Sequence, residues 1–191
     1  MAEKKTPPKS AVDFEEFRSY LRLLARMQMP QQIQARLGAS DIVQLTMLQA
    51  INGADDFRGS TKPEKAAWLR QILARNLAHA LRDNRRQKRD VRRERSLEVS
   101  VHASSARLID WLAADQSSAS QKAVFNERVL LLSDALEKLP EPQRLAIELH
   151  YWHGLKLAEV AERLEKTNAA VAGLLHRGLK QLRKALDETP T

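Results

Sequence analysis

The residues of this sequence that are best suited to chemistry with a partner are cationic and lie near its C-terminal end. Over residues 168–186, basic side chains recur at spacings that an α-helix brings to one face: His176, Arg177, Lys180, Arg183 and Lys184. Groups arranged in this way form ion pairs with the phosphates of a nucleic acid. The other face of the segment is apolar: Val171, Leu175, Leu179, Leu182 and Leu186. The pattern predicts a helix that is buried on one side and positively charged on the other.

A shorter segment before this helix completes the pattern of a helix-turn-helix. Residues 157–164 carry Val160 and Ala161 on one side. The break at residues 165–167 is short, and Thr167 is placed to cap the next helix by accepting a hydrogen bond from a free backbone N–H. We interpret the two helices as a unit that binds duplex DNA. An amphipathic hairpin with a solvated basic face is the alternative that the spacing leaves open.

Prolines separate this unit from the helix before it. Two prolines within residues 139–142 end one helix, and Pro142 suits the first turn of the next. Apolar residues then recur along one helical face until Gly154 offers a stop: Leu145, Leu149 and Trp152. The helix-turn-helix is therefore predicted to pack against at least one further helix.

The charge of the whole chain supports a polyanionic partner. The sequence has 32 lysines and arginines against 24 aspartates and glutamates, a formal net charge of +8 and a pI near 10. Positive charge is concentrated between Arg82 and Arg95, where eight residues are basic and three are acidic. Because this run has no apolar stripe to bury, we expect it to be solvated or in contact with a partner such as nucleic acid.

The composition also limits the fold class and the compartment. Helical periodicity occurs throughout the 191 residues and the alternating pattern of strands does not, so we predict an all-α fold. The absence of cysteine excludes disulfides and thiolate metal sites and fits a reducing cytoplasm. No apolar run approaches 18 residues, and the first ten residues are not signal-like. We expect a cytoplasmic protein without membrane insertion and with a disordered N-terminus over residues 1–12.

A shift in composition divides the chain into two small helical domains. Residues 96–120 contain seven serines and only one basic residue, which is typical of a linker. We predict a flexible polar linker over residues 96–122, between domains at residues 13–95 and 123–187. An apolar group around Trp111 leaves open whether the linker docks or is a plain tether.

The first domain is predicted to contain helices on both sides of a loop. One helix ends near Pro30, and Ser40 is placed to cap a second helix over residues 41–51. After a loop over residues 52–63, a long helix begins at Glu64 and continues into the arginine-rich run. The result is a compact helical module with one cationic end.

Three stretches of the chain resemble a known protein family. The first combines DIVQ at 41–44 with FRG at 57–59, the second includes AWL at 67–69 and ARNLA at 74–78, and the third is the helix-turn-helix with LHR at 175–177. In this order, and joined by a polar linker, they look like regions 2 and 4 of bacterial RNA polymerase sigma factors. The chain most resembles the two-domain extracytoplasmic-function (ECF) group of the sigma-70 family.

This resemblance implies the function and the partners. A protein of this kind binds core RNA polymerase, directs it to promoters and helps to open the DNA, without catalytic activity and without a cofactor or metal. The resemblance assigns the contact with polymerase to Asp41, Ile42, Val43 and Gln44. An anti-sigma factor is a further partner that the family suggests and the sequence does not identify.

The resemblance also assigns two sets of residues to promoter DNA. The set for the minus-ten element is Arg75, Asn76, His79, Arg82, Arg85, Arg86, Lys88 and Arg89. The set for the minus-35 element is Thr167, Asn168, Ala172, His176, Arg177, Lys180 and Arg183. An amide such as Asn76 reads a base edge through paired donor and acceptor. Arg75 is its rival, because family members commonly have one residue fewer between the positions of Trp68 and Asn76.

Two positions depart from the pattern of the family. Around Ala172 the helix has small or apolar side chains, which donate no hydrogen bonds to bases, so base reading would be weak, based on DNA shape, or shifted to Asn168, His176 and Arg177. Glu165 lies where the turn often has glycine, which costs up to about 1 kcal/mol if the position needs a positive φ.

Other functions remain open from the sequence alone. An autonomous helix-turn-helix transcriptional regulator is the main alternative, although it leaves the first domain unexplained. An RNA-binding protein lacks support because no aromatic stacking array is present. An enzyme is disfavoured because no phosphate-binding glycine loop exists, and a metal held by His150 and His153 has no nearby carboxylate ligand other than Glu148.

Overall fold

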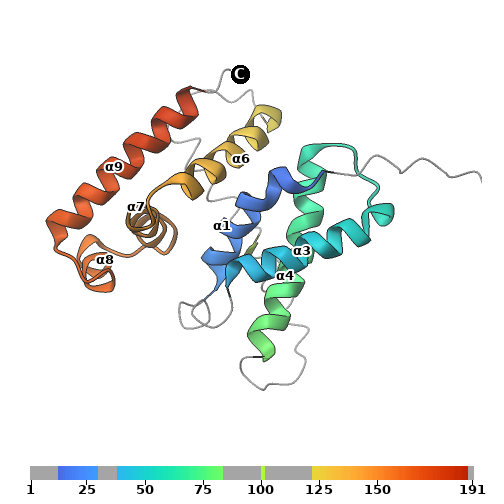
Figure 1. Cartoon of the computed structure of the whole chain (residues 1–191), viewed down its shortest axis with the longest axis horizontal. Helices are drawn as coiled ribbons and strands as arrows, with labels where there is room; N and C mark the ends of the chain where they lie inside the picture. Colours follow the sequence, from blue (N-terminus) through green and yellow to red (C-terminus); the bar gives the residue numbers. More distant parts are fainter. Residues whose placement is uncertain (1–12, 30–37, 84–99, 102–121, 189–191) are drawn as a thin grey trace, which may run out of the picture.

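The computed structural model describes residues 13–29, 38–83, 100–101 and 122–188. Every regular element within these ranges is a helix, which confirms the predicted all-α class. Predictions for residues 1–12 and for most of the linker lie outside the described residues. Figure 1 shows the helices in two groups that follow the order of the sequence.

The first group consists of α1 (Arg18–Gln28), α3 (Ala39–Asn52) and α4 (Lys62–Asp83), with short 3-10 turns at Glu15–Phe17 and Ala54–Asp56. Helix α3 packs along α4, and α1 contacts both. The side chains that hold the group together are leucines at helical spacing, fully buried: Leu21, Leu24, Leu69, Leu73 and Leu77. Burial of each such leucine contributes about 1.5–3 kcal/mol, so this core fixes how the three helices lie.

Both α3 and α4 start earlier than the sequence indicated. Ser40 does not cap α3; instead, the carboxylate of Asp41 accepts a hydrogen bond from the backbone N–H of Gly38 at 3.1 Å. Helix α4 begins at Lys62 because Glu64 and Thr61 cap it reciprocally. The Glu64 carboxylate accepts the Thr61 N–H at 3.0 Å, and the Thr61 hydroxyl accepts the Glu64 N–H at 3.4 Å.

The second group consists of α6 (Lys122–Lys138), α7 (Glu141–Ile147), α8 (Leu157–Arg163) and α9 (Asn168–Asp187), with a π-helical turn at Glu148–Trp152 after α7. Helix α9 contacts the other three helices of this group. Its apolar stripe supplies the buried residues Val171, Leu175 and Leu182, as the spacing predicted.

A glycine sets the distance between α7 and α9. A Cβ atom on Gly178 would lie 2.7 Å from Cδ1 of Ile147, which is closer than carbon atoms approach one another. Ile147 is fully buried, so its side chain has little room to move away. The absence of a side chain at Gly178 therefore lets the two helices pack this closely.

The turn before α9 has the geometry that the sequence predicted. The hydroxyl of Thr167 accepts a hydrogen bond from the N–H of Ala170 at 3.2 Å and so caps α9. Glu165 has a φ of +53°, a conformation that favours glycine. The cost of up to about 1 kcal/mol that a residue other than glycine has at a positive φ therefore applies to Glu165.

The two groups contact each other through α1. Helix α1 packs against α6, and the buried residues of both groups belong to one continuous apolar cluster. A short described piece of the predicted linker also packs here, with Val101 fully buried. The hydroxyl of Ser100 and the side-chain amide of Gln28 at the end of α1 are joined at 2.6 Å. This part of the linker is therefore docked.

The part of the chain that the structure describes contains neither a candidate membrane span nor a candidate metal site. None of its helices is long and apolar enough to cross a membrane. No group of three or more His, Cys, Asp or Glu side chains there is placed to hold a metal ion. His150 has another partner, because its Nδ1 is hydrogen bonded to the carbonyl of Leu155 at 2.8 Å.

Candidate functional site

The candidate nucleic-acid surface on α9 is exposed along its length. All seven residues assigned to the minus-35 element are exposed: Thr167, Asn168, Ala172, His176, Arg177, Lys180 and Arg183. They are positioned because the apolar stripe of α9 packs on α6, α7 and α8 and turns the opposite face to solvent. The N-terminal turn of α9, which carries the positive end of the helix dipole, belongs to the same surface. The structure thus brings these residues together on one helix face.

One arginine lies over the glycine of this face. A Cβ atom on Gly173 would lie 3.1 Å from Nη1 of Arg177, so the guanidinium of Arg177 lies over the glycine. Ala172 beside it is exposed. Gly173 and Ala172 themselves carry no hydrogen-bond donor, so Asn168, His176 and Arg177 stay the predicted readers of base edges on this face.

The candidate minus-ten surface on α4 differs from the prediction at its central residue. Asn76 is 5% exposed, and its Nδ2 donates a hydrogen bond to the hydroxyl of Thr46 on α3 at 3.0 Å. The amide of Asn76 is therefore buried between two helices, and its contact with a base stays a prediction. Arg75 and His79, spaced four residues apart, are exposed on the outer face of α4. The rival Arg75 is therefore the better placed residue.

The rest of the arginine-rich set is not placed by the structure. The backbone of Arg82 belongs to the last turn of α4, and its side chain is not described. Arg85, Arg86, Lys88 and Arg89 lie outside the described residues. Their proposed contacts with the DNA backbone stay predictions.

A half-buried tryptophan organises the loop before α4. The ring of Trp68 lies 5.6 Å from that of Phe14 and 5.1 Å from that of Phe57, measured between centroids. A Cβ atom on Gly59 would lie 2.4 Å from the ring of Phe57, so this position requires glycine. Aromatic packing thus holds the FRG stretch of residues 57–59 against the first turns of α4.

The residues assigned to polymerase divide between surface and core. Asp41 and Gln44 are exposed on α3, in agreement with a role in binding. Ile42 and Val43 are 3% and 0% exposed, so in this structure they belong to the core, and their contact with polymerase stays a prediction. They face α1 and α4 and hold α3 in place, because a helix packed on two neighbours buries the residues between its exposed positions.

The structure adds three residues that the sequence did not single out. Leu45, Leu48 and Ile51 are 45%, 54% and 60% exposed, and their spacing of three places them on one face of α3. Large apolar side chains that gather on a surface mark a contact with another protein. The signal available in the sequence was that α3 has more large apolar residues than one buried face of a helix can hold. We call Leu45, Leu48 and Ile51 the apolar face of α3.

Comparison with known families gives two matches in the same order along the chain. The family model described as "Sigma-70 region 2" matches residues 16–87, which include α1, α3 and α4. The model described as "Sigma-70, region 4" matches residues 130–182, which include the helix-turn-helix and most of α9. Together the two matches cover more than half of the chain.

Proposed function

The chain belongs to the sigma-70 family as a sigma factor that binds RNA polymerase and recognises promoters, and we propose that it is a member of the ECF group. Two domains support this subgroup: a region 2 domain at residues 13–95 and a region 4 domain at residues 123–187, with a linker over residues 96–122. The proposed mechanism is binding and positioning alone, so the chain acts without catalytic residues, cofactor or metal. It acts in the cytoplasm, where its proposed partners are.

The surface for core polymerase is the exposed side of α3. The observation that carries this assignment is the apolar face of Leu45, Leu48 and Ile51 beside the polar residues Asp41 and Gln44. An apolar centre with a polar rim is typical of a protein interface. A stand-alone DNA-binding regulator has no need of such a face in its first domain. The same surface suits an anti-sigma factor, since a protein that covers it would exclude polymerase.

The surfaces for promoter DNA are the outer faces of α9 and α4. On α9, Arg177 and Lys180 contact phosphates next to the minus-35 element while His176 and Asn168 reach base edges. On α4, Arg75 and His79 face the minus-ten element, and the arginine-rich run from Arg82 follows the backbone upstream of it. The net charge of +8 attracts the chain to DNA over the whole of these surfaces.

The test of this function is co-elution with bacterial core RNA polymerase in gel filtration, without DNA and at near-physiological salt. Co-elution at equimolar ratio is the expected result. A Leu48→Asp variant should elute separately, whereas Gln49→Asp, which changes a neighbouring exposed residue, should still co-elute. If the folded wild type elutes apart from intact core enzyme, yet binds DNA, it is an autonomous helix-turn-helix regulator instead.

A further inference from the structure

The guanidinium of Arg177 lies against the backbone of α9, one helical turn before the position of Arg177 itself. A Cβ atom built on Gly173 would be 3.1 Å from Nη1 of Arg177, 3.6 Å from Nη2 and 3.7 Å from Cζ. Three atoms of the guanidinium are therefore within contact distance of the place that a side chain of Gly173 would take. We call this arrangement of Arg177 over Gly173 the Gly173 seat.

The seat exists because Gly173 has no side chain. Even a methyl group at this position would make the guanidinium move by a few tenths of an ångström. A larger side chain would extend beyond Cβ into the space of the guanidinium itself. Side chains of a helix point toward its N-terminus, so an arginine four residues after the glycine is well placed to use this space.

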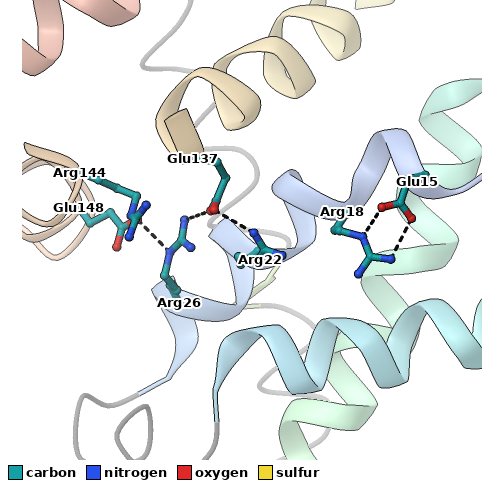
Figure 2. Close-up of polar contacts among 7 residues, drawn as sticks. All are labelled: Glu15, Arg18, Arg22, Arg26, Glu137, Arg144 and Glu148. Carbon is teal, nitrogen blue, oxygen red and sulfur yellow. Dashed lines mark hydrogen bonds and ion pairs between the residues drawn. The ribbon is translucent and has the colours of Figure 1, made fainter. Parts of the chain in front are cut away.

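Arg177 differs from the arginines of α1, because no carboxylate holds it. Figure 2 shows the arginines of α1 next to carboxylates, as in the pair of Arg22 and Glu137, where Nη1 and Oε2 are 2.9 Å apart. On α9, the positions one turn from Arg177 carry no acidic residue: 173, 174, 180 and 181. Within the described part of the chain, Arg177 takes part in no ion pair. Its N–H donors are available to a partner outside the chain.

The seat changes where the charge of Arg177 lies along α9. Gly173 precedes Arg177 by four residues, which is about 6 Å along the axis of an α-helix. Lys180, the next exposed cation, follows Arg177 by three residues, or about 4.5 Å. From Gly173 to Lys180 the rise is about 10 Å. The seat thus separates two like charges that helical spacing would otherwise bring together.

Separated cations are suited to a strand of phosphates. One strand of duplex DNA has a phosphate about every 3.4 Å along the axis, so two cations about 10 Å apart meet different phosphates. Two cations at neighbouring positions would compete for the same phosphate. Because each neutralised phosphate releases its own counterions, separated cations contribute more to affinity than competing ones.

We propose that Gly173 is a positioning residue for the DNA contact of α9: by leaving room for the guanidinium of Arg177, it directs that cation to a phosphate separate from the one that Lys180 binds. The inference rests on the proposed function and deepens it, because it concerns how the α9 surface holds DNA. Gly173 needs no contact with DNA for this role. The neighbouring Ala172 is exposed and small, so it leaves the seated guanidinium open to DNA.

The first experiment tests the seat in the free chain, without DNA. In the NMR spectrum of the wild type, nuclear Overhauser effects should connect the α protons of Gly173 with the side-chain protons of Arg177. Nitrogen relaxation should show restricted motion of the Arg177 Nε–H, and Gly173→Leu should increase this motion. Absence of the Overhauser effects in the folded wild type would overturn the seat.

The second experiment measures the contact with phosphate. Fluorescence anisotropy of a short labelled duplex of mixed sequence, titrated with the full chain over a salt series, gives the slope of log K against log salt concentration. A mixed sequence suffices because phosphate contacts carry no sequence information. Arg177→Ala should reduce the slope by about 0.9, and Gly173→Leu should reduce it by a similar amount. Because both changes remove one contact, the double variant should lose about 0.9 in total and not about 1.8.

The matched control is Ala172→Leu, which places the same side chain on the neighbouring exposed position. Its effect on affinity should add to that of Arg177→Ala, because it leaves the seat intact. Circular dichroism should show an intact fold in every variant. Additive losses of slope for Gly173→Leu and Arg177→Ala, or a wild-type slope for Gly173→Leu, would overturn the positioning role while leaving the proposed function standing. If the wild type binds no duplex, the proposed DNA contact fails together with the positioning role, and the NMR result still decides whether the seat exists.

Discussion

The side-chain amide of Asn76 on α4 donates a hydrogen bond to the hydroxyl of Thr46 on α3 at 3.0 Å, inside the core of the first domain. The same hydroxyl donates to the carbonyl of Ile42 at 2.8 Å. The two polar side chains therefore satisfy each other between helices that are otherwise joined by leucines. In this structure Asn76 therefore helps to pack α4 against α3, and its role in reading a base stays a prediction.

Replacing Asn76 should lower stability more than it affects DNA directly. Asn76→Ala removes the donor to Thr46 and leaves a small cavity, so we expect a loss of about 1–3 kcal/mol in the free energy of unfolding. Urea unfolding followed by circular dichroism measures it. Arg75→Ala, on the exposed side of the same helix, should change stability by no more than about 0.5 kcal/mol and weaken promoter binding. Unchanged stability of Asn76→Ala together with loss of permanganate-reactive thymines at the promoter would indicate that Asn76 reads a base and does not stabilise the core.

The apolar face of α3 should matter for polymerase and not for folding. Leu48→Asp places a charge at the centre of the proposed interface, where it loses hydration on binding. We expect polymerase affinity to fall at least about tenfold, which corresponds to about 1.4 kcal/mol, while the unfolding free energy stays within about 0.5 kcal/mol of wild type. Asp41→Ala is a poor probe by comparison, because its carboxylate also caps α3 through Gly38. Normal polymerase affinity of Leu48→Asp would remove the apolar face from the interface.

The basic face of α9 should set the salt dependence of promoter binding. Arg177→Ala and Lys180→Ala each remove one exposed cation, so each should reduce the slope of log K against log salt concentration by about 0.9. Filter binding or fluorescence anisotropy over a salt series gives the slope. Lys138→Ala, an exposed cation at the end of α6, is the control and should leave the slope unchanged. Slopes equal to wild type for Arg177→Ala and Lys180→Ala would show that neither touches phosphate.

Two glycines on α9 allow a test of how closely it packs. Gly173→Ala adds a methyl group beside the flexible end of Arg177 and gains helix propensity, so stability should rise by up to about 1 kcal/mol. Gly178→Ala gains the same propensity, but its methyl group meets buried Ile147 at 2.7 Å. Overpacking of this kind costs about 1–3 kcal/mol, and we expect a net loss. Thermal unfolding of both variants measures the difference. A stabilised Gly178→Ala would mean that Ile147 and α7 shift away from the added methyl group at little cost in free energy.

The sequence was informative where one face of a helix is apolar and the other is polar. The stripe from Val171 to Leu186 predicted α9, its buried side and its exposed cations, and Thr167 was identified correctly as the cap. Helix α3 was less predictable, because Ile42 and Val43 are as apolar as Leu45 and Leu48. Only the packing of α3 on two neighbours separates the buried pair from the exposed pair.

Contacts between distant residues could not be predicted at all. Arg22 and Glu137 are 115 positions apart, and neither stands out by type from the other charged residues of a chain rich in both charges. The same holds for Asn76, whose partner Thr46 is a residue on another helix. Such pairs depend on how helices pack, and the spacing of residues along one helix carries no information about it.

Glu137 and Glu148, which form ion pairs with Arg22 and Arg26 of α1, should change the pH dependence of stability in opposite directions. Burial raises the pKa of Glu148 above its ordinary value of 4.5, although Arg26 and Arg144 oppose the shift. Burial also acts to raise the pKa of Glu137, but hydrogen bonds and charge from Arg26 and Arg22 outweigh it, so that this pKa lies below 4.5. As pH falls from 7 through the folded-state pKa of Glu148 towards 4.5, the folded chain takes up the proton first, which adds stability. As pH falls below 4.5, the unfolded chain protonates first at Glu137, which removes stability.

Glu148→Gln should therefore lose stability more steeply than wild type above pH 4.5, and Glu137→Gln should lose it less steeply below pH 4.5. The difference in each case is up to about 1.4 kcal/mol for each unit of pKa shift. Urea unfolding at a series of pH values between 7 and 3 measures both slopes. Parallel curves for the two variants and the wild type would show that neither carboxylate changes its pKa on folding and that the charges at the domain contact are hydrated.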